Sequence, residues 1–375
     1  MKMNLLLVNY METTAPGGIN TAVRQVGRTL ALRGHEVTVL QPNPGDRPRE
    51  EVCDGITIQR VDAPLSELLY GFDVFLWADL KARYSVLSPD VVHVQGYHSL
   101  FSSEAVYLVR RLDPRVPLIF SFHLDVYRER FLARRLWNVY KKTVGSKMVG
   151  ALSRVVADSQ FEAETISREF RVPRDQISVI PLGVSVVDTR RTLKDDRGPR
   201  LLYVGHLVRR KNVQSIVESL HVLVHQKNVR DASLTIVGAG PERESISRVI
   251  RERGLEAHVT MKPFLERADL MREIKNADVF VLLSNSEAYG IAVAEALALG
   301  TPCVVTNATA LSEFTREPGC FGVDYPPDPE TVAQLIIDVY ERRVQVGPFS
   351  DKIRTWDAVG RAYERLYCRC VKRPM

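Results

Sequence analysis

Short apolar runs that alternate with helix-forming segments constrain the fold of this chain most. Most of these runs are predominantly apolar, which is typical of strands buried on both faces of a parallel sheet. The runs are Met3–Tyr10, Val37–Gln41, Ile56–Val61, Pro89–Val94, Val116–Phe122, Val155–Ser159, Ile177–Gly183, Arg200–Gly205, Leu234–Gly240, Val259–Leu265 and Ala277–Leu283. We therefore predict an α/β protein made of parallel βαβ units, whose ligands bind beyond the carboxyl ends of the strands.

The length of the chain and a polar stretch in its middle predict two domains. At 375 residues the chain exceeds the size of one typical hydrophobic core. Residues 185–199 are polar and charged without a clear period, as in a linker. We place an N-terminal domain at residues 1–190, a C-terminal domain at 191–355 and a final helix at 356–375.

Cysteine usage and the lack of a long apolar run predict a cytoplasmic protein. The five cysteines are odd in number and scattered, so we expect reduced thiols, no disulfide framework and no zinc site. No apolar run approaches the roughly 18 residues of a membrane-spanning helix. Met1–Tyr10 lacks the features of a signal peptide.

One segment accounts for the net charge of +6. Between Val126 and Lys147 there are seven basic residues and one acid, and the aromatic Trp137 and Tyr140 lie among apolar residues at helical spacing. Two interpretations stay open. This helix packs on the core with a solvated basic face, or residues 127–147 dock on an anionic membrane surface or a charged acceptor. No recognition motif accompanies the charge, so we expect no nucleic-acid partner.

The stretch Ser284–Val305 carries the strongest chemical pattern of the chain. Gly290 lets the backbone approach a ligand at the start of a helix, where free N–H groups favour a phosphate. If Gly290–Val293 holds a diphosphate, Glu287 and Glu295 can reach the sugar on one side and the ribose on the other. The alternative is that both glutamates are ordinary helix-start residues on a solvated face.

The pattern Glu287-x-Tyr289-Gly290-x4-Glu295 resembles the E-x7-E signature of retaining glycosyltransferases of GT-B fold, specifically the group 1 (family 4) enzymes. The resemblance implies two Rossmann-like domains with parallel sheets facing a central cleft. It also implies that the final helix, residues 356–375, crosses back to the first domain, with a dimer helix as the alternative.

The same resemblance assigns the residues of this stretch. In the family the first glutamate holds the hydroxyls of the donor sugar and the second holds the ribose, so Glu287 is a candidate catalytic residue and Glu295 a donor-binding residue. The residues between them are expected to contact the donor: Tyr289, Gly290, Ile291, Ala292 and Val293.

A basic turn follows the strand Arg200–Gly205, and fixed cations there suit a diphosphate leaving group. The turn is similar to the family pattern G-R-L-V-x-x-K-G, which makes Lys211 a candidate catalytic residue. His206 replaces the family arginine and Asn212 the final glycine. The missing cation could come from Arg209, from Arg210 or from His206 if it is protonated at lower pH. The alternative for the two arginines is that they belong to a solvated basic turn without a ligand.

Other donor contacts are expected from glycines and from a later strand. Gly17 and Gly18 lie in the turn after the first strand, and because they lack side chains a ligand can contact the main chain there. The family has a Gly-Gly loop at this position that faces donor and acceptor. The segment Val259–Leu265 resembles the strand and loop that contact the nucleotide base. The resemblance assigns that contact to three residues, Pro263, Phe264 and Leu265.

Three histidines, His93, His98 and His123, lie at or just after strand ends of the first domain. His123 matches the histidine of a T-x-H-D type motif that contacts the donor sugar in the family, so we expect it to be catalytic. His93 is expected to be structural. On the acceptor side we expect His98 and Asn20.

No metal ion or further cofactor is expected. The chain lacks an Asp-x-Asp motif, so positive side chains and helix-start amides must hold the diphosphate. Gly238-x-Gly240 lacks the third glycine of a dinucleotide fingerprint, which disfavours NAD.

The resemblance implies a glycosyltransferase of hexosyltransferase type. It would move a sugar with retention from a UDP- or GDP-linked donor to a glycan or lipid-linked acceptor, as a cytoplasmic enzyme peripheral on the inner face of the membrane. Three alternatives stay open: a nucleotide-sugar epimerase, a glycan phosphorylase of GT-B fold, or a non-catalytic relic that binds sugar nucleotides.

Overall fold

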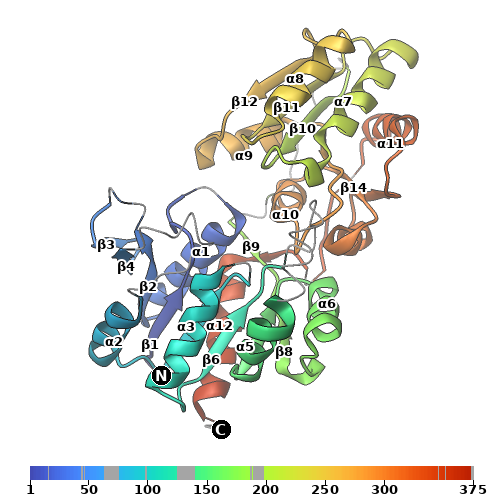
Figure 1. Cartoon of the computed structure of the whole chain (residues 1–375). Coiled ribbons are helices and arrows are strands. Elements are labelled where there is room, and N and C mark those ends of the chain that lie inside the picture. Colours follow the sequence, from blue (N-terminus) through green and yellow to red (C-terminus); the bar gives the residue numbers. More distant parts are fainter. Residues whose placement is uncertain are drawn as a thin grey trace. The chain divides into compact units, whose positions relative to one another are not determined.

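The chain forms two compact units (Figure 1). The first unit contains Met1–Gly183 together with Trp356–Met375, and the second contains Val184–Thr355. The computed structural model describes residues 1–15, 17–43, 45, 47–62, 76–97, 99–124, 140–185, 188, 198–344, 346–350 and 352–372. The division falls a few residues before the expected boundary at 190, and the final helix belongs to the first unit.

The first unit is built on an eight-stranded sheet with the order β3-β4-β2-β1-β5-β6-β7-β8. Its strands are β1 (Asn4–Val8), β2 (Glu36–Asn43), β3 (Glu50–Cys53), β4 (Ile56–Asp62), β5 (Val91–Gln95), β6 (Leu118–Ser121), β7 (Arg154–Ala157) and β8 (Ile177–Val179). The pairs are parallel except β3 with β4, which is antiparallel. The antiparallel edge strand β3 was not predicted, because its sequence EEVC forms no apolar run.

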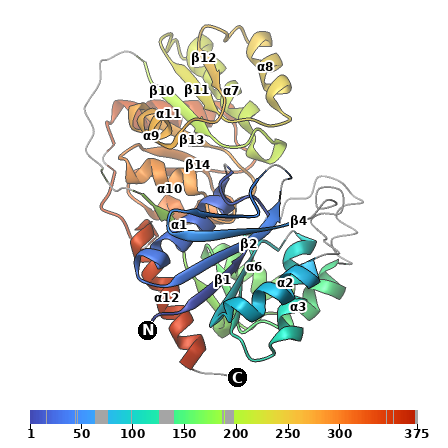
Figure 2. The ribbon, with the colours of Figure 1, turned by 90° about the vertical axis from the view of Figure 1, so that its left-hand side faces the viewer.

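Helices cover both faces of this sheet, as Figure 2 shows for α1 and α12 on one side and α2 and α3 on the other. They are α1 (Gly18–Leu32), α2 (Leu76–Leu87), α3 (Leu100–Leu112), α5 (Ser146–Gly150), α6 (Gln160–Phe170) and α12 (Trp356–Lys372), with a π-helix at Lys141–Gly145 and a 3-10 helix at Arg174–Gln176. A Cβ atom on Gly360 of α12 would lie 2.2 Å from Cγ2 of Thr29, so this glycine lets α12 approach α1 closely.

The second unit has a six-stranded parallel sheet with the order β12-β11-β10-β13-β14-β15. Its strands are β10 (Arg200–Val204), β11 (Ser233–Val237), β12 (Val259–Lys262), β13 (Val279–Leu282), β14 (Cys303–Thr306) and β15 (Cys320–Val323). Its helices are α7 (Val213–His221), α8 (Arg243–Glu252), α9 (Arg267–Asn276), α10 (Ile291–Ala298) and α11 (Pro329–Glu341), with a π-helix at Val222–Gln226 and 3-10 helices at Arg209–Lys211 and Thr309–Arg316. The short strands β9 (Gly183–Val184) and β16 (Arg354–Thr355) form a separate sheet.

The strand order of each sheet reverses at one point. The reversal lies between β1 and β5 in the first unit and between β10 and β13 in the second. Open parallel sheets bind ligands outside the carboxyl ends of the strands at such a switch point. The predicted α/β class with parallel sheets is confirmed. Gly17, Lys211 and Glu287 follow strands at these reversals, whereas His123 and the residues 263–265 follow the strands β6 and β12, which lie further out.

Candidate functional site

The basic turn of the second unit is anchored to the sheet beneath it. Tyr203 is fully buried in β10 and donates a hydrogen bond of 2.9 Å from its hydroxyl to the carbonyl oxygen of His206. The turn ends at Asn212, whose φ of 54° and ψ of 38° place it in the left-handed conformation. Glycine and asparagine adopt this conformation with least strain, which explains how Asn212 replaces the glycine of the family pattern.

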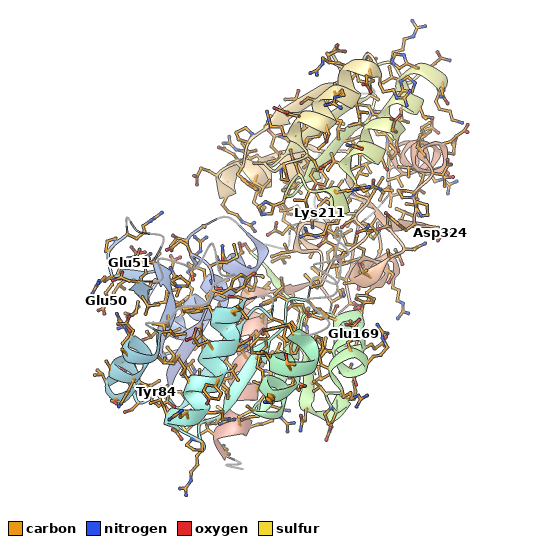
Figure 3. All side chains as sticks on the ribbon, viewed as in Figure 1. Glu50, Glu51, Tyr84, Glu169, Lys211 and Asp324 are labelled. Atoms are coloured by element: carbon orange, nitrogen blue, oxygen red, sulfur yellow. The ribbon has the colours of Figure 1, made fainter. Side chains whose placement is uncertain are left out.

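Lys211, labelled in Figure 3, forms an ion pair with Glu287. Their side chains are 15% and 13% exposed, so the pair is largely shielded from water. The carbonyl oxygen of Arg210 accepts hydrogen bonds from the Asn285 amide at 3.0 Å and from the Ser284 hydroxyl at 3.2 Å. The loops after β10 and β13 thus bring the predicted lysine and the first predicted glutamate together.

The start of α10 has the geometry that its sequence predicts. Gly290 precedes the helix with a φ of 102°, and a Cβ atom there would lie 2.7 Å from Cδ2 of Leu311. Both the backbone conformation and the space therefore require glycine. The amide of Val293 already donates to the carbonyl of Gly290 at 3.0 Å. The amides of Ile291 and Ala292, at the positive end of the helix, are the ones that suit a phosphate.

Tyr289 packs inside the second unit. Its side chain is 2% exposed, and its hydroxyl donates a 2.8 Å hydrogen bond to the carbonyl oxygen of Lys352. The ammonium of Lys352 lies 5.1 Å from the centre of the Tyr289 ring and 2.6 Å from a carboxylate oxygen of Glu313. These contacts fix the loop before α10, and a donor contact of Tyr289 would come from its main chain.

Glu295 is buried in α10 and pairs with Arg267, the first residue of α9. The distance from Oε1 of Glu295 to Nη1 of Arg267 is 2.6 Å. Burial raises the pKa of Glu295, and the charge and hydrogen bond of Arg267 oppose part of this rise. The low exposure of Glu287 and Glu295 rules out the solvated helix face as their setting. The sequence analysis missed Arg267, because an arginine at the start of a helix is no signal of a site.

His206 is a poor substitute for the arginine of the family pattern. Burial and the charges of Lys211 and Arg210 lower its pKa, which disfavours the hypothesis that a protonated His206 supplies the missing cation. Its ring centre lies 5.1 Å from that of Phe264, in an edge-to-face contact. Arg209 is exposed in the same turn and remains the better candidate.

The loop after β12 keeps the predicted position for a base contact. Pro263 and Phe264 are exposed and Leu265 is half-buried. An exposed aromatic ring and main-chain groups are suited to the flat face and polar edge of a nucleotide base.

In the first unit, hydrogen bonds within the unit shape the glycine turn. Gly17 precedes α1, which begins at Gly18. Asn20 is 1% exposed; its Nδ2 donates to the carbonyl oxygen of Ala15 at 3.3 Å, and its Oδ1 accepts from Nδ2 of Asn9 at 3.3 Å. Asn20 therefore holds the turn in shape, which the predicted acceptor-side role did not anticipate.

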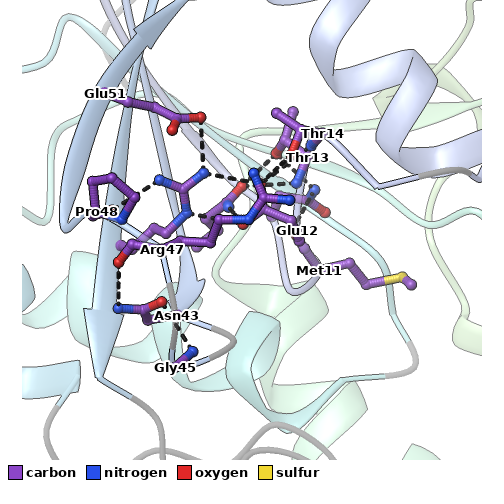
Figure 4. Close-up of polar contacts among 12 residues, drawn as sticks. Met11, Glu12, Thr13, Thr14, Asn43, Gly45, Arg47, Pro48 and Glu51 are labelled. Carbon is purple, nitrogen blue, oxygen red and sulfur yellow. Dashed lines mark hydrogen bonds and ion pairs between the residues drawn. The ribbon is translucent and has the colours of Figure 1, made fainter.

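A buried ion network that the sequence analysis missed supports the same turn (Figure 4). Arg60 is fully buried and pairs with Glu12 and Glu51, each at 2.9 Å, while Nε2 of Gln41 donates to Glu12 at 2.7 Å. Burial raises the pKa of Glu12, but hydrogen bonds led by that of Arg60 outweigh it and lower the pKa to about 2. The only signal in the sequence is a cation inside the apolar run Ile56–Val61.

His123 follows β6 and has both ring nitrogens engaged within the first unit. Nδ1 lies 2.7 Å from Oδ2 of Asp158, and Nε2 lies 2.9 Å from Oε1 of Gln95. Burial lowers the pKa of His123, but Asp158 more than offsets this and the pKa is raised. The residue has a φ of 49°, an uncommon conformation for histidine that fits the role predicted for a functional residue.

Glu162 holds the backbone around His123. Its carboxylate accepts the amide of Leu124 at 2.5 Å and that of Asp158 at 2.6 Å, and burial raises its pKa. Ser159 caps α6 by accepting the amide of Glu162 at 3.0 Å. The spacing Ser159-x-x-Glu162 is that of a capping box, and this spacing is the signal from which the structural role of Glu162 could have been predicted. The glutamate here binds amides of two loops in place of the Ser159 amide.

The other histidines and the basic segment are only partly described. His93 is buried between Oη of Tyr367 at 2.7 Å and Oγ of Ser121 at 2.9 Å, and burial lowers its pKa to about 3, so it is a neutral structural residue. His98 lies outside the described residues.

Much of the basic segment, residues 125–139, also lies outside the described part of the chain. At its described end, the Tyr140 ring lies 5.4 Å from that of Tyr97, and Met148 is buried. This end packs on the core, while the membrane contact stays a prediction.

Metal-binding clusters and membrane-spanning helices are both absent from the described part of the chain. Within these ranges no group of three or more His, Cys, Asp or Glu side chains is placed to hold a metal ion. None of the helices described there has the length and apolar character needed to cross a membrane.

Two family models match the chain. Glycosyl transferases group 1 matches residues 187–354, and Glycosyltransferase Family 4 matches residues 16–187. A D-inositol 3-phosphate glycosyltransferase of Paenarthrobacter aurescens is 27% identical over 368 residues, 88% of this chain and 87% of that protein. An alpha-monoglucosyldiacylglycerol synthase of Acholeplasma laidlawii is 23% identical over 340 residues, 85% of this chain and 84% of that protein.

Solved structures share the fold across the whole chain. Sucrose-phosphate synthase from Thermosynechococcus elongatus matches with a TM-score of 0.78 and 20% identity, covering 98% of this chain and 99% of that one. HepE from Anabaena, in complex with UDP and glucose, matches with a TM-score of 0.69 and 15% identity, covering 99% and 97%.

Proposed function

Because this chain belongs to the group 1 (family 4) glycosyltransferases of GT-B fold, we propose that it transfers a sugar from a nucleoside-diphosphate sugar to a hydroxyl group, with retention at the anomeric carbon. The observation that carries the proposal is the pairing of Lys211 with Glu287 beside the start of α10, at the switch point of the second sheet. The UDP complex of HepE supports a nucleotide donor, and we expect UDP or GDP.

We assign each candidate group of the second unit to the part of the donor that its chemistry suits. The amides of Ile291 and Ala292 and the ammonium of Lys211 bind the diphosphate, with Arg209 as the additional cation. Glu287 accepts hydroxyls of the sugar. Glu295 accepts those of the ribose. The residues Pro263, Phe264 and Leu265 contact the base.

The reaction needs charge stabilisation more than a protein nucleophile. The bond from the anomeric carbon to the diphosphate oxygen breaks, and the acceptor oxygen bonds to the same face of that carbon. The acceptor proton passes to an oxygen of the leaving diphosphate. Lys211 and the α10 amides stabilise the charge that grows on this leaving group, and one such donor is worth roughly 10²–10³ in rate. His123 is assigned to the donor sugar because the family resemblance implies this role.

The acceptor is a hydroxyl of a glycan or a lipid-linked molecule. The relative from Acholeplasma laidlawii, whose name includes a diacylglycerol, supports a lipid acceptor at a membrane surface. No metal ion takes part in this proposal, because Lys211, Arg209 and the helix amides supply the positive charge.

The direct test is turnover of the purified chain with UDP-, GDP- and ADP-linked sugars and candidate acceptors. We expect release of one nucleoside diphosphate and a product whose anomeric configuration, measured by NMR, matches that of the donor. An inverted product would refute retention. Epimerised donor or phosphate-dependent cleavage of a glycan would favour the epimerase or the phosphorylase. Nucleotide binding without turnover would favour a relic.

A further inference from the structure

We propose that Arg267 is a positioning residue that holds Glu295 as an oriented carboxylate acceptor for the ribose hydroxyls of the nucleotide. This inference rests on the proposed function. It is carried by the contact between Nη1 of Arg267 and Oε1 of Glu295, at 2.6 Å across two different helices. A contact this short joins the guanidinium group to the carboxylate directly, so Arg267 acts on the charge and orientation of Glu295 and not only on packing.

Arg267 has little other role in the packing. It is the first residue of α9, its side chain is 41% exposed, and its Nη2 donates to Oγ of Ser185 at 3.2 Å. Glu295 lies in the middle of α10 with 6% of its side chain exposed. Removing the guanidinium should therefore leave the fold intact and act mainly on the state of Glu295.

Glu295 needs a cation because its surroundings are apolar. An ionised carboxylate can accept two hydroxyl hydrogen bonds, whereas a protonated one is itself a donor and has fewer acceptor sites. Burial raises the pKa of Glu295, and Arg267 is the group that lowers it. A guanidinium contact at Oε1 leaves Oε2 as an acceptor for a ribose hydroxyl.

The other groups around α10 do not replace Arg267. On α9, Lys275 is paired with Asp188 at 2.7 Å, and the Asp188 amide donates to the carbonyl of Ala298. On β14, burial raises the pKa of Cys303 well above its ordinary value, so this thiol is neutral. The strand β13, VFVL, has no titratable side chain, and Glu295 is the only one within α10.

The experiment measures nucleotide affinity as a function of pH for the whole chain. UDP, GDP and ADP are titrated into the wild type by calorimetry, and the tightest binder is used with the variants Arg267→Met and Arg267→Lys. The control is Arg272→Met, on the same helix, whose side chain is 75% exposed. The ratio of variant to wild-type Kd is compared, because titration of the nucleotide itself cancels in that ratio.

We expect Arg267→Met to weaken binding by about tenfold at pH 6, the usual order for a lost hydrogen bond to a charged group, and by clearly less at pH 8.5, because a carboxylate without its cation ionises only at higher pH. Its Kd at low pH should approach that of Glu295→Gln. Arg267→Lys should restore most of the affinity, and Arg272→Met should behave as the wild type.

A nucleotide without ribose hydroxyls separates this role from a structural one. With the 2′,3′-dideoxy form of the same nucleotide, the wild type should bind more weakly and Arg267→Met should add no further loss. Equal or tighter binding by Arg267→Met at every pH, or an equal loss with the dideoxy nucleotide, would overturn the inference. Failure of the wild type to bind any nucleotide would instead refute the proposed function.

Discussion

The two sheets of this protein have the same kind of switch point, but the polar groups near the two switch points have different roles. In the first unit, the polar groups near the switch point bind one another: Arg60 with Glu12, His123 with Asp158 and Gln95, and Asn20 with Asn9. In the second unit, the shielded ion pair of Lys211 and Glu287 joins the turn that carries the exposed Arg209 to the loop that leads into α10. The first set of groups holds the backbone in place, with His123 the one member that we also assign to the donor sugar, and the second set offers positive charge to a ligand.

The difference has an energetic basis. A buried charge is costly unless it is paired, so the first unit uses its charges in closed networks whose disruption costs stability. Charges that must bind a diphosphate cannot be fully neutralised by the protein, because their value lies in the interaction with the ligand. Substitutions in the first unit should therefore change the free energy of unfolding, and those in the second should change binding and rate.

The largest effect is expected from Arg60→Met. This change leaves Glu12 and Glu51 without their buried cation and should lower the free energy of unfolding by about 3–5 kcal/mol, as found when a buried ion pair loses one partner. Urea unfolding followed by circular dichroism checks this. The control is Arg49→Met, which removes an exposed pair with Asp62 and should cost about 1 kcal/mol or less. A similar, small loss in both variants would refute the importance of the network.

The next effect is expected from Lys211→Met. The rate of sugar transfer should fall by about 10²–10³, or roughly 3–4 kcal/mol of transition-state stabilisation, and the free energy of unfolding should fall by less than in Arg60→Met, because Glu287 keeps partial access to water. Steady-state kinetics and urea unfolding measure the two quantities. Lys227→Met, a change of the same kind at a weak surface pair with Glu330, should alter neither. Activity within twofold of the wild type for Lys211→Met would contradict the site.

A smaller, pH-dependent effect is expected from Asp158→Asn. Burial lowers the pKa of His123 and Asp158 raises it above the ordinary value, so the pair stabilises the fold fully below about pH 6.5 and less as the pH rises through the folded-state pKa. The loss of stability should be about 1–3 kcal/mol at pH 6 and smaller at pH 9. An unfolding difference that is flat or grows with pH would show that His123 is not charged by Asp158.

The smallest effect is expected from His206→Arg, which restores the cation of the family pattern. Because the pKa of His206 is lowered, the histidine brings no charge near neutral pH, and an arginine should tighten nucleoside-diphosphate binding several-fold, by about 1 kcal/mol. Calorimetric titration of the best-binding nucleotide tests this. Weaker binding would mean that the contact of His206 with Phe264 matters more than charge.

Local patterns in the sequence pointed to the candidate residues of the second unit, and partners from distant segments explain the contacts that were missed. Lys211, Glu287 and Gly290 were found because each lies just beyond an apolar run, where a parallel sheet must present its ligand groups. The pair of Arg267 and Glu295 joins two helices, and neither α9 nor α10 alone signals it.

The same limit applied in the first unit. The contact of Arg60 with Glu12 joins residues that are 48 positions apart, and that of His123 with Asp158 joins residues 35 positions apart. The edge strand β3 was missed because its glutamates give it no apolar run.

The measurement that most directly tests the central claim is hydrogen–deuterium exchange of the whole chain with and without its tightest-binding nucleoside diphosphate. The account predicts strong protection in two peptides, one covering residues 205–212 and one covering residues 287–293, and weaker protection in the turn of residues 9–18. Protection confined to that turn, with the amides at the start of α10 unchanged, would contradict it.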